Sequence, residues 1–115
     1  TGVVHDGRTA LELVADLHPS AAVCGTPTDT ARDVIAELDL LDRGRYAGPV
    51  GWIDARGDGE WAIALRCAHL EGPRRLRLYA GCGIVAGSSP QDELAEAEAK
   101  LTPMREALQS DRPSA

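Results

Sequence analysis

The sequence predicts a mixed α/β (α+β) fold, in which a three-stranded antiparallel meander packs with helices. Apolar residues recur at helical spacing in two segments before residue 42, and the pattern then changes to a period of two. The Asp-Gly pair at residues 58–59 separates two alternating runs and is typical of a β-hairpin turn. The expected order of elements is therefore α-α-β-β-β-α.

The first two elements are expected to be helices. Residues 9–17 form the first, with Thr9 as its N-cap, and Pro19 ends it because proline disfavours helical geometry in the residue before it. The second covers residues 29–41, with Thr28 or Asp29 as its cap. Its apolar stripe consists of Val34, Ile35, Leu38 and Leu41.

Three strands and a last helix follow. The strands are expected at residues 46–54, 61–70 and 75–80, with the turn of the first hairpin at 56–59. Ser88-Ser89-Pro90 then opens a helix with a serine cap and a proline at its first position. Pro103 is expected to kink or interrupt this helix, and the tail from Ser110 to fray.

Composition narrows the classes of partner. The chain has 115 residues, enough for one domain, and its net charge of −6 argues against nucleic-acid binding. The absence of an apolar run of about 18 residues argues against a membrane span. Three cysteines without metal-ligand spacing favour a reducing cytoplasm over a disulfide framework. The start at Thr1, without a methionine, is interpreted as an excised piece of a longer protein.

Glu93, Glu96 and Lys100 form the most informative constellation. Their spacing places them on one face of the last helix. Two carboxylates suit a hard cation such as Mg²⁺, and the lysine could hold an anion that the metal brings in. The alternative is a solvated helix face with an ordinary Glu96–Lys100 ion pair.

Three further features are candidates for binding. Arg66 lies among alanines on one face of the strand at 61–70, opposite Gly51, and could fork onto a carboxylate; alternatively, it pairs with a buried acid beneath a close-packed helix. Gly81-Cys82-Gly83 is either an anion-binding nest or a tight turn. His18, before Pro19, is either functional or structural.

Five stretches together resemble the chorismate-utilising enzymes, a family that includes isochorismate, salicylate and anthranilate synthases. The stretches are LHPSAAVCGTP (17–27), DRGRYAGPVGW (42–52), GDGEWAIALRCA (57–68), LRLYAGCGIVAGSSP (76–90) and ELAEAEAKL (93–101). They occur in the family's order and cover nearly the whole chain. The resemblance implies that residues 1–115 are a single C-terminal segment of the catalytic domain, within the two-layered family fold, of a protein about three times as long.

The resemblance also implies roles on the last helix and the loop before it. Glu96 matches a Mg²⁺ ligand of the family, and Glu93 contributes to the same site. Lys100 matches a lysine near the ring carboxylate of chorismate. Gly81 and Gly83 match glycines whose backbone contacts the substrate.

Other implied roles fall earlier in the chain. Arg66 matches the arginine that binds the enolpyruvyl carboxylate, and Tyr46 matches its aromatic partner. His18 matches the histidine of the family's His-Pro motif and is the expected catalytic residue of this segment. Ala22 stands where salicylate- and anthranilate-forming members carry threonine, which favours isochorismate synthase.

The implied reaction is the Mg²⁺-dependent conversion of chorismate to isochorismate, feeding siderophore or menaquinone biosynthesis. The family's general base, a lysine, and its general acid, a glutamate, both match positions upstream of this chain, as does a further Mg²⁺ ligand. The missing N-terminal part of the same enzyme is therefore an expected partner, and this segment alone is expected to be inactive. The alternatives are a salicylate, anthranilate or aminodeoxychorismate synthase, and a non-catalytic module that retains the fold.

Overall fold

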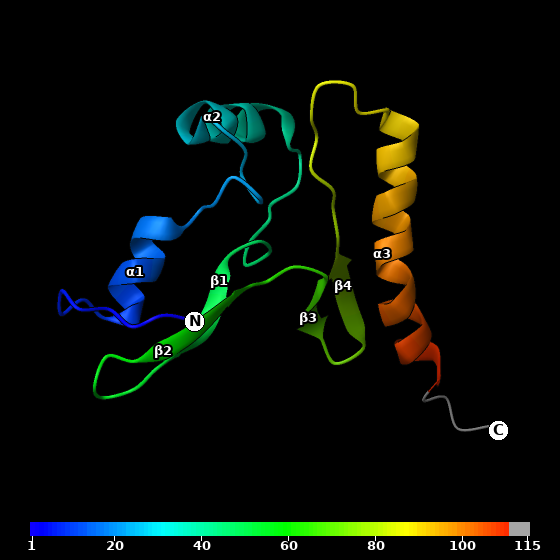
Figure 1. The fold of residues 1–115 in the computed structure, drawn as a ribbon. Helices are drawn as coiled ribbons and strands as arrows, with labels where there is room; N and C mark the ends of the chain where they lie inside the picture. Colours follow the sequence, from blue (N-terminus) through cyan, green and yellow to red (C-terminus); the bar gives the residue numbers. More distant parts are fainter. Residues whose placement is uncertain (111–115) are drawn as a thin grey trace. The chain divides into compact units, whose positions relative to one another are not determined.

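A computed structural model describes residues 1–110 of the chain (Figure 1). The chain divides into two compact units, residues 1–64 and residues 65–115, and each is described by itself. The elements are α1 (Ala10–Leu17), α2 (Thr28–Leu38), β1 (Pro49–Ile53), β2 (Gly59–Ile63), β3 (Cys67–Gly72), β4 (Arg75–Tyr79) and α3 (Pro90–Ser110). Mixed helices and antiparallel strands confirm the predicted fold class, but four strands in two pairs replace the expected three-stranded meander.

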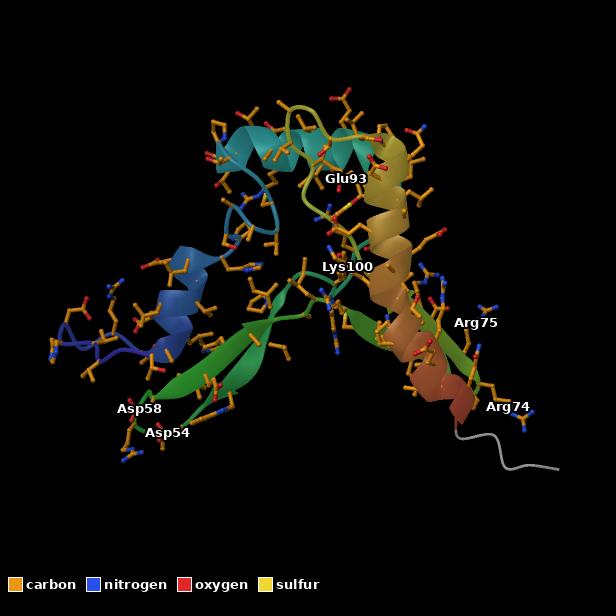
Figure 2. The ribbon with its side chains drawn as sticks, turned by 45° about the vertical axis from the view of Figure 1, so that its right-hand side comes forward. Asp54, Asp58, Arg74, Arg75, Glu93 and Lys100 are labelled. Atoms are coloured by element: carbon orange, nitrogen blue, oxygen red, sulfur yellow. The ribbon has the colours of Figure 1, made fainter. Side chains whose placement is uncertain are left out.

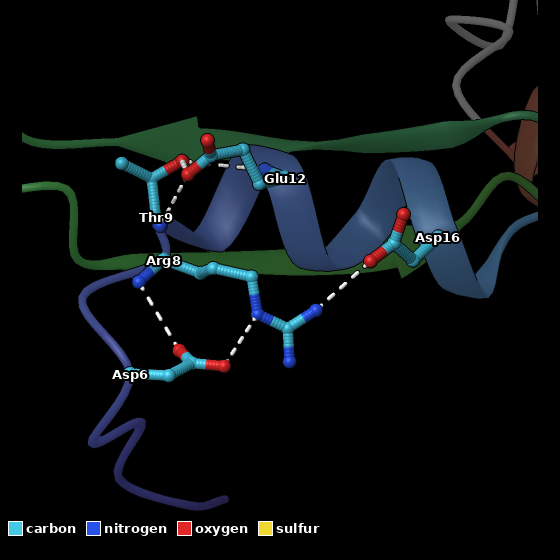
Figure 3. A network of polar contacts seen from close by, with 5 residues as sticks. All are labelled: Asp6, Arg8, Thr9, Glu12 and Asp16. Atoms are coloured by element: carbon cyan, nitrogen blue, oxygen red, sulfur yellow. Dashed lines mark hydrogen bonds and ion pairs between the residues drawn. The ribbon is translucent and has the colours of Figure 1, made fainter.

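Helix α1 begins at its predicted N-cap, Thr9, which also forms a complete capping box with Glu12. The Glu12 N–H donates to the Thr9 hydroxyl at 3.3 Å, and the Thr9 N–H donates to the Glu12 carboxylate at 2.7 Å (Figure 3). Arg8 bridges Asp6 and Asp16 with ion pairs of 2.7 and 2.9 Å, which tie the preceding segment to the helix (Figure 3). These reciprocal contacts satisfy backbone donors that a helix start otherwise leaves open.

Helix α2 differs from its prediction at both ends. Its N-cap is Pro27, and neither of the predicted caps makes a side-chain capping bond. The helix ends at Leu38, earlier than predicted, because Asp39 is extended and its carboxylate accepts the Leu41 N–H at 3.1 Å. Such local side-chain bonds offer the backbone an alternative to helical bonding.

Strands β1 and β2 form an antiparallel hairpin whose turn is organised by Asp54. The Asp54 N–H donates to the Asp58 carbonyl at 2.7 Å, and the Asp54 carboxylate accepts the Arg56 and Asp58 N–H groups. Gly51 lies opposite Trp61, where an added Cβ would lie only 2.1 Å from the Glu60 carbonyl oxygen. The close backbone approach therefore requires glycine. Helix α1 packs against this hairpin.

The prediction of one continuous strand over residues 61–70 is wrong, because residues 64–66 interrupt it. Strand β2 ends at Ile63, β3 begins at Cys67, and Arg66 between them has a φ of +46°. A residue at positive φ lies outside the extended region that a strand requires, so the alternation of side chains does not continue across it. The expected pairing of Arg66 with Gly51 is also wrong, because the hairpin turn lies between Ile53 and Gly59 and the resulting register places Gly51 opposite Trp61.

The second unit contains the β3–β4 hairpin and α3. Cys67 pairs with Tyr79, and the register shifts between Leu70 and Gly72. Helix α3 contacts β4 and begins at Pro90, as predicted. It continues through Pro103 without interruption, contrary to one of the two outcomes expected there. The predicted fraying beyond Ser110 concerns residues outside the described range.

Few apolar side chains are buried in residues 1–110. The buried hydrophobic residues are Ala47, in the first unit, and Tyr79, in the second. Exposed large apolar residues occur in both units and include Val50, Trp52, Leu65, Leu70, Ile84 and Leu94. So few buried and so many exposed large apolar residues are typical of a chain that packs against a further polypeptide segment.

Candidate functional site

In the first unit, His18 and Tyr46 line one cavity of about 280 Å³. His18 is the C-cap of α1, and its N–H donates to the Val14 carbonyl at 3.0 Å. Tyr46 belongs to a turn in which its N–H donates to the Arg43 carbonyl at 2.8 Å. The structure thus brings together two predicted site residues that are far apart in the sequence. Ala22 is exposed in the turn after α1 and is not among the residues that line this cavity.

Two arginines that sequence reasoning missed also line this cavity. Arg43 donates to the Asp39 carboxylate at 2.7 Å and to the Val23 carbonyl at 3.4 Å. The guanidinium of Arg43, followed by the Leu41 N–H, holds the pKa of Asp39 below its ordinary value. Arg32, on α2, is the second. Its position on an ordinary polar helix face gave no signal in the sequence.

Arg66 is the first candidate site residue of the second unit, and it lies between two strands, whereas the sequence predicted it within one. Its side chain is exposed, so it is not packed under a helix beside a buried acid. None of the ion pairs found within residues 1–110 includes Arg66. A non-glycine residue at positive φ is uncommon, and such strained conformations cluster at ligand-binding positions.

Helix α3 carries the predicted trio on one face, and Glu93 and Lys100 project from the same side of it (Figure 2). The Lys100 ammonium lies 2.5 Å from Glu96 Oε1 and also donates to the Gly81 carbonyl at 2.9 Å. The predicted Glu96–Lys100 ion pair is therefore present. The face is not simply solvated, because the Lys100 side chain is only 22% exposed, whereas that of Glu96 is 56% exposed.

Glu93 has a separate set of partners in the loop before α3. The Cys82 thiol donates to the Glu93 carbonyl at 3.3 Å, and Ser88 hydrogen-bonds the Glu93 side chain. Hydrogen bonds from Ser88 and then Cys82 lower the pKa of the Glu93 carboxyl below its ordinary value. The neighbouring Glu93 side chain, together with burial, raises the pKa of the Cys82 thiol. The loop and the first turn of α3 are thus joined by polar contacts.

The glycine loop is open on its other side. A Cβ added at Gly83 would meet nothing within 4 Å, and its φ lies outside the left-handed region. Gly83 therefore leaves room beside the backbone and is not required by a tight left-handed turn. Within residues 1–110, the N–H groups of Cys82 and Gly83 are not used by another backbone carbonyl.

The donor chemistry of Glu93 and Glu96 fits Mg²⁺ in kind. Magnesium in proteins is usually held by one or two carboxylates, with waters and substrate oxygens completing its shell. Within the described part of the chain, no group of three or more histidine, cysteine or acidic side chains is placed to hold a metal ion. The two glutamates could therefore supply part of a magnesium shell, which other oxygens would complete. Across residues 1–110, no helix is both long and apolar enough to cross a lipid bilayer.

Relatives of known name match most of this chain but only part of their own length. Isochorismate synthase DhbC of Bacillus subtilis is 57% identical over 103 residues, which are 90% of this chain and 26% of that protein. The vibriobactin-specific isochorismate synthase of Vibrio cholerae is 52% identical over 92 residues, or 80% of this chain and 23% of that protein. The chain thus spans about a quarter of the length of these relatives, less than the third that the resemblance implies.

A solved structure and a family model agree with these relatives. A Bacillus anthracis protein assigned as a 2,3-dihydroxybenzoate-specific isochorismate synthase, DhbC, superposes with a TM-score of 0.87 at 47% identity. The match covers 93% of this chain and 28% of that one. The family model described as "chorismate binding enzyme" matches residues 1–109. The chain therefore belongs to the chorismate binding enzyme family.

Proposed function

We propose that this chain is the C-terminal catalytic segment of a Mg²⁺-dependent isochorismate synthase. The observation that carries the proposal is the 57% identity with the Bacillus subtilis isochorismate synthase across nine-tenths of the chain. A second Bacillus subtilis isochorismate synthase, MenF, is 43% identical over 96% of the chain. The names of these relatives include both siderophore and menaquinone types, so either pathway is compatible with the proposal.

The reaction moves a hydroxyl group around the ring of chorismate. Water adds at ring C2, the double bonds shift, and the C4 hydroxyl departs as water after it receives a proton, so the overall change is an isomerisation. Chorismate carries two carboxylates. A site for it therefore needs cationic groups and oriented donors at two places, and their preorganisation stabilises charge that develops during the reaction.

Residues of the second unit are suited to the two carboxylates. The exposed guanidinium of Arg66 would fork onto the enolpyruvyl carboxylate, an arrangement that favours arginine over lysine. The backbone of Gly81 and Gly83, with the nearby ammonium of Lys100, would receive the ring carboxylate. Glu93 and Glu96 would hold Mg²⁺, which when bound would neutralise that carboxylate and polarise the departing hydroxyl.

Residues of the first unit would act at the ring. His18 and Tyr46 line one cavity, so both residues would lie beside the same bound group. We assign His18 the role of orienting the departing hydroxyl and Tyr46 that of an aromatic partner for the enolpyruvyl side chain. Ala22 in place of threonine would leave the aminating or lyase reactions of other family members unsupported.

The proton transfers would come from the remainder of the polypeptide. The resemblance places the general base and general acid upstream, and the exposed apolar residues of both units would pack against that same part. The segment and its upstream part would together form one catalytic domain of a cytoplasmic enzyme.

The proposal is tested by incubating the full-length polypeptide with chorismate and Mg²⁺ and identifying the product chromatographically. Isochorismate is the expected product, and chelation of the metal should stop its formation. Salicylate, or anthranilate in the presence of ammonia, would instead support another branch of the family. Tight binding of chorismate with no product would support a non-catalytic module.

A further inference from the structure

The Lys100 ammonium contacts one carboxylate oxygen of Glu96, the residue proposed to hold a metal ion. We propose that Lys100 is an internal counter-ion that competes with the divalent metal for Glu96, so that metal binding and the Glu96–Lys100 ion pair exclude one another. The inference rests on the proposed function, because it requires Glu96 to be a metal ligand. It goes beyond that function by assigning Lys100 a role in the metal-free enzyme.

Two contacts and partial burial hold the Lys100 ammonium against Glu96, where it would compete with a metal ion. The ammonium lies 2.5 Å from Glu96 Oε1, and its second contact with the Gly81 carbonyl holds it at that position. The Lys100 side chain is partly buried, so water screens it less than it would a free surface lysine. An ion pair between residues four apart on a helix needs no backbone change to form.

A bound metal ion would remove the reason for this contact. Mg²⁺ binds carboxylate oxygens at about 2.0–2.1 Å, so a metal at this oxygen would place two positive charges within a few ångströms of each other. The ammonium would then withdraw from Glu96 while its contact with Gly81 remains possible. A lysine freed in this way lies beside the glycine loop, where it is available to an anion. Metal binding and anion binding would thus favour each other.

The experiment is isothermal titration calorimetry of Mg²⁺ into the full-length polypeptide without substrate. Lys100→Met removes the competing charge and should lower the Kd for Mg²⁺ about three- to tenfold. Arg105→Met is the matched control, because Arg105 is an exposed cation of the same helix without a contact to Glu96. It should change the Kd by less than about twofold, since exposed charges farther apart are screened. Lys100→Gln serves as a second, polar variant if Lys100→Met folds poorly.

The outcomes separate this inference from the proposed function. An unchanged or higher Kd for Mg²⁺ in both Lys100 variants would overturn the proposed competition. A fall in the Kd of Arg105→Met as large as that of Lys100→Met would overturn it as well. Glu96→Gln should weaken Mg²⁺ binding, and in that background Lys100→Met should no longer tighten it. If Glu96→Gln weakens binding but the Lys100 variants do not tighten it, the metal assignment stands and the competition fails. If Glu96→Gln leaves the Kd for Mg²⁺ unchanged, both the assignment of Glu96 as a metal ligand and the competition by Lys100 fail.

Discussion

Lys100 and Gly81, separated by 19 positions in the chain, are joined by a hydrogen bond of 2.9 Å from the ammonium to the carbonyl oxygen. The bond fastens the glycine loop to the face of α3 that carries Glu96. The same ammonium contacts Glu96, so one side chain joins the loop backbone and a carboxylate of the helix.

Glu96→Gln in the full-length enzyme should abolish Mg²⁺-dependent turnover and leave the fold nearly intact. Glutamine keeps the shape and one oxygen, but it loses the charge that draws a hard cation. If Glu96 acted only as the ion-pair partner of Lys100, the change would cost about 0.3–0.5 kcal/mol of stability and no activity. Chorismate turnover as a function of Mg²⁺ concentration, beside thermal melts, distinguishes the two.

The matched control for this change is Glu98→Gln. Glu98 is exposed, lies two residues further along α3, and therefore points away from the Glu96 face. Its substitution should leave both kcat and the Mg²⁺ half-saturation unchanged. Equal behaviour of the two variants would assign the Glu96 face to ordinary surface.

Arg66→Ala should raise the KM for chorismate strongly, because it removes a charge-assisted contact with a carboxylate that is worth about 1.5–3 kcal/mol. Arg66→Lys should restore only part of this loss, since an ammonium lacks the two-pronged geometry. The measurement is steady-state kinetics of the full-length variants. Near wild-type kinetics for Arg66→Ala would contradict a role of this residue in binding the substrate carboxylate.

Arg66→Gly distinguishes the effect of losing the guanidinium from the effect of the backbone conformation at residue 66. Glycine adopts a φ of +46° without strain, so this variant should lose activity as Arg66→Ala does but melt at a higher temperature than the alanine variant. The expected difference in stability is about 1 kcal/mol. Equal melting temperatures of the two variants would argue against a strained backbone at this position.

The isolated 115-residue chain should not convert chorismate to isochorismate. The resemblance places the family's base and acid upstream of it, and Lys100 is its only lysine. Incubation of the purified chain with chorismate and Mg²⁺ should therefore give only the uncatalysed rate. Turnover well above that rate, without a companion polypeptide, would contradict the assignment of proton transfer to the upstream part.

Gly51→Ala should lower the melting temperature of the full-length enzyme, with a loss of about 1–3 kcal/mol of stability. The added methyl group would lie 2.1 Å from the Glu60 carbonyl oxygen, so the two strands would have to separate. Gly72→Ala is the control within the other hairpin, because a Cβ there would meet nothing within 4 Å. It should change stability by less than about 0.5 kcal/mol. A similar loss in both variants would contradict the close backbone approach at Gly51 as the cause.

Acid should weaken the contact that closes α2. The pKa of Asp39 lies below its ordinary value of 3.8, because Arg43 and the Leu41 N–H favour its charged form. Its contribution to stability is therefore complete above the ordinary value and is lost as the pH falls through the lower, folded-state pKa. Melting curves of wild type and Asp39→Asn should differ near neutral pH and converge in strong acid. A constant difference at every pH would exclude this titration.

Local structure followed closely from local sequence. Thr9 and Glu12 stand at the spacing of a capping box, and both of its bonds are present. The spacing of Glu93, Glu96 and Lys100 predicted one helix face because helical geometry fixes that relation. The start of α3 at Pro90 followed from the fixed φ of proline.

The tertiary structure decided where distant segments meet and where a regular pattern stops. Alternation continued in the sequence through residues 61–70, and neither glycine nor proline marked the bend at Arg66. The meeting of His18 with Tyr46 in one cavity, and of Lys100 with Gly81, depends on how loops return to a helix. Sequence spacing fixes contacts within one turn of a helix or one hairpin. Contacts across loops depend on the packing of the whole unit, which no short pattern encodes.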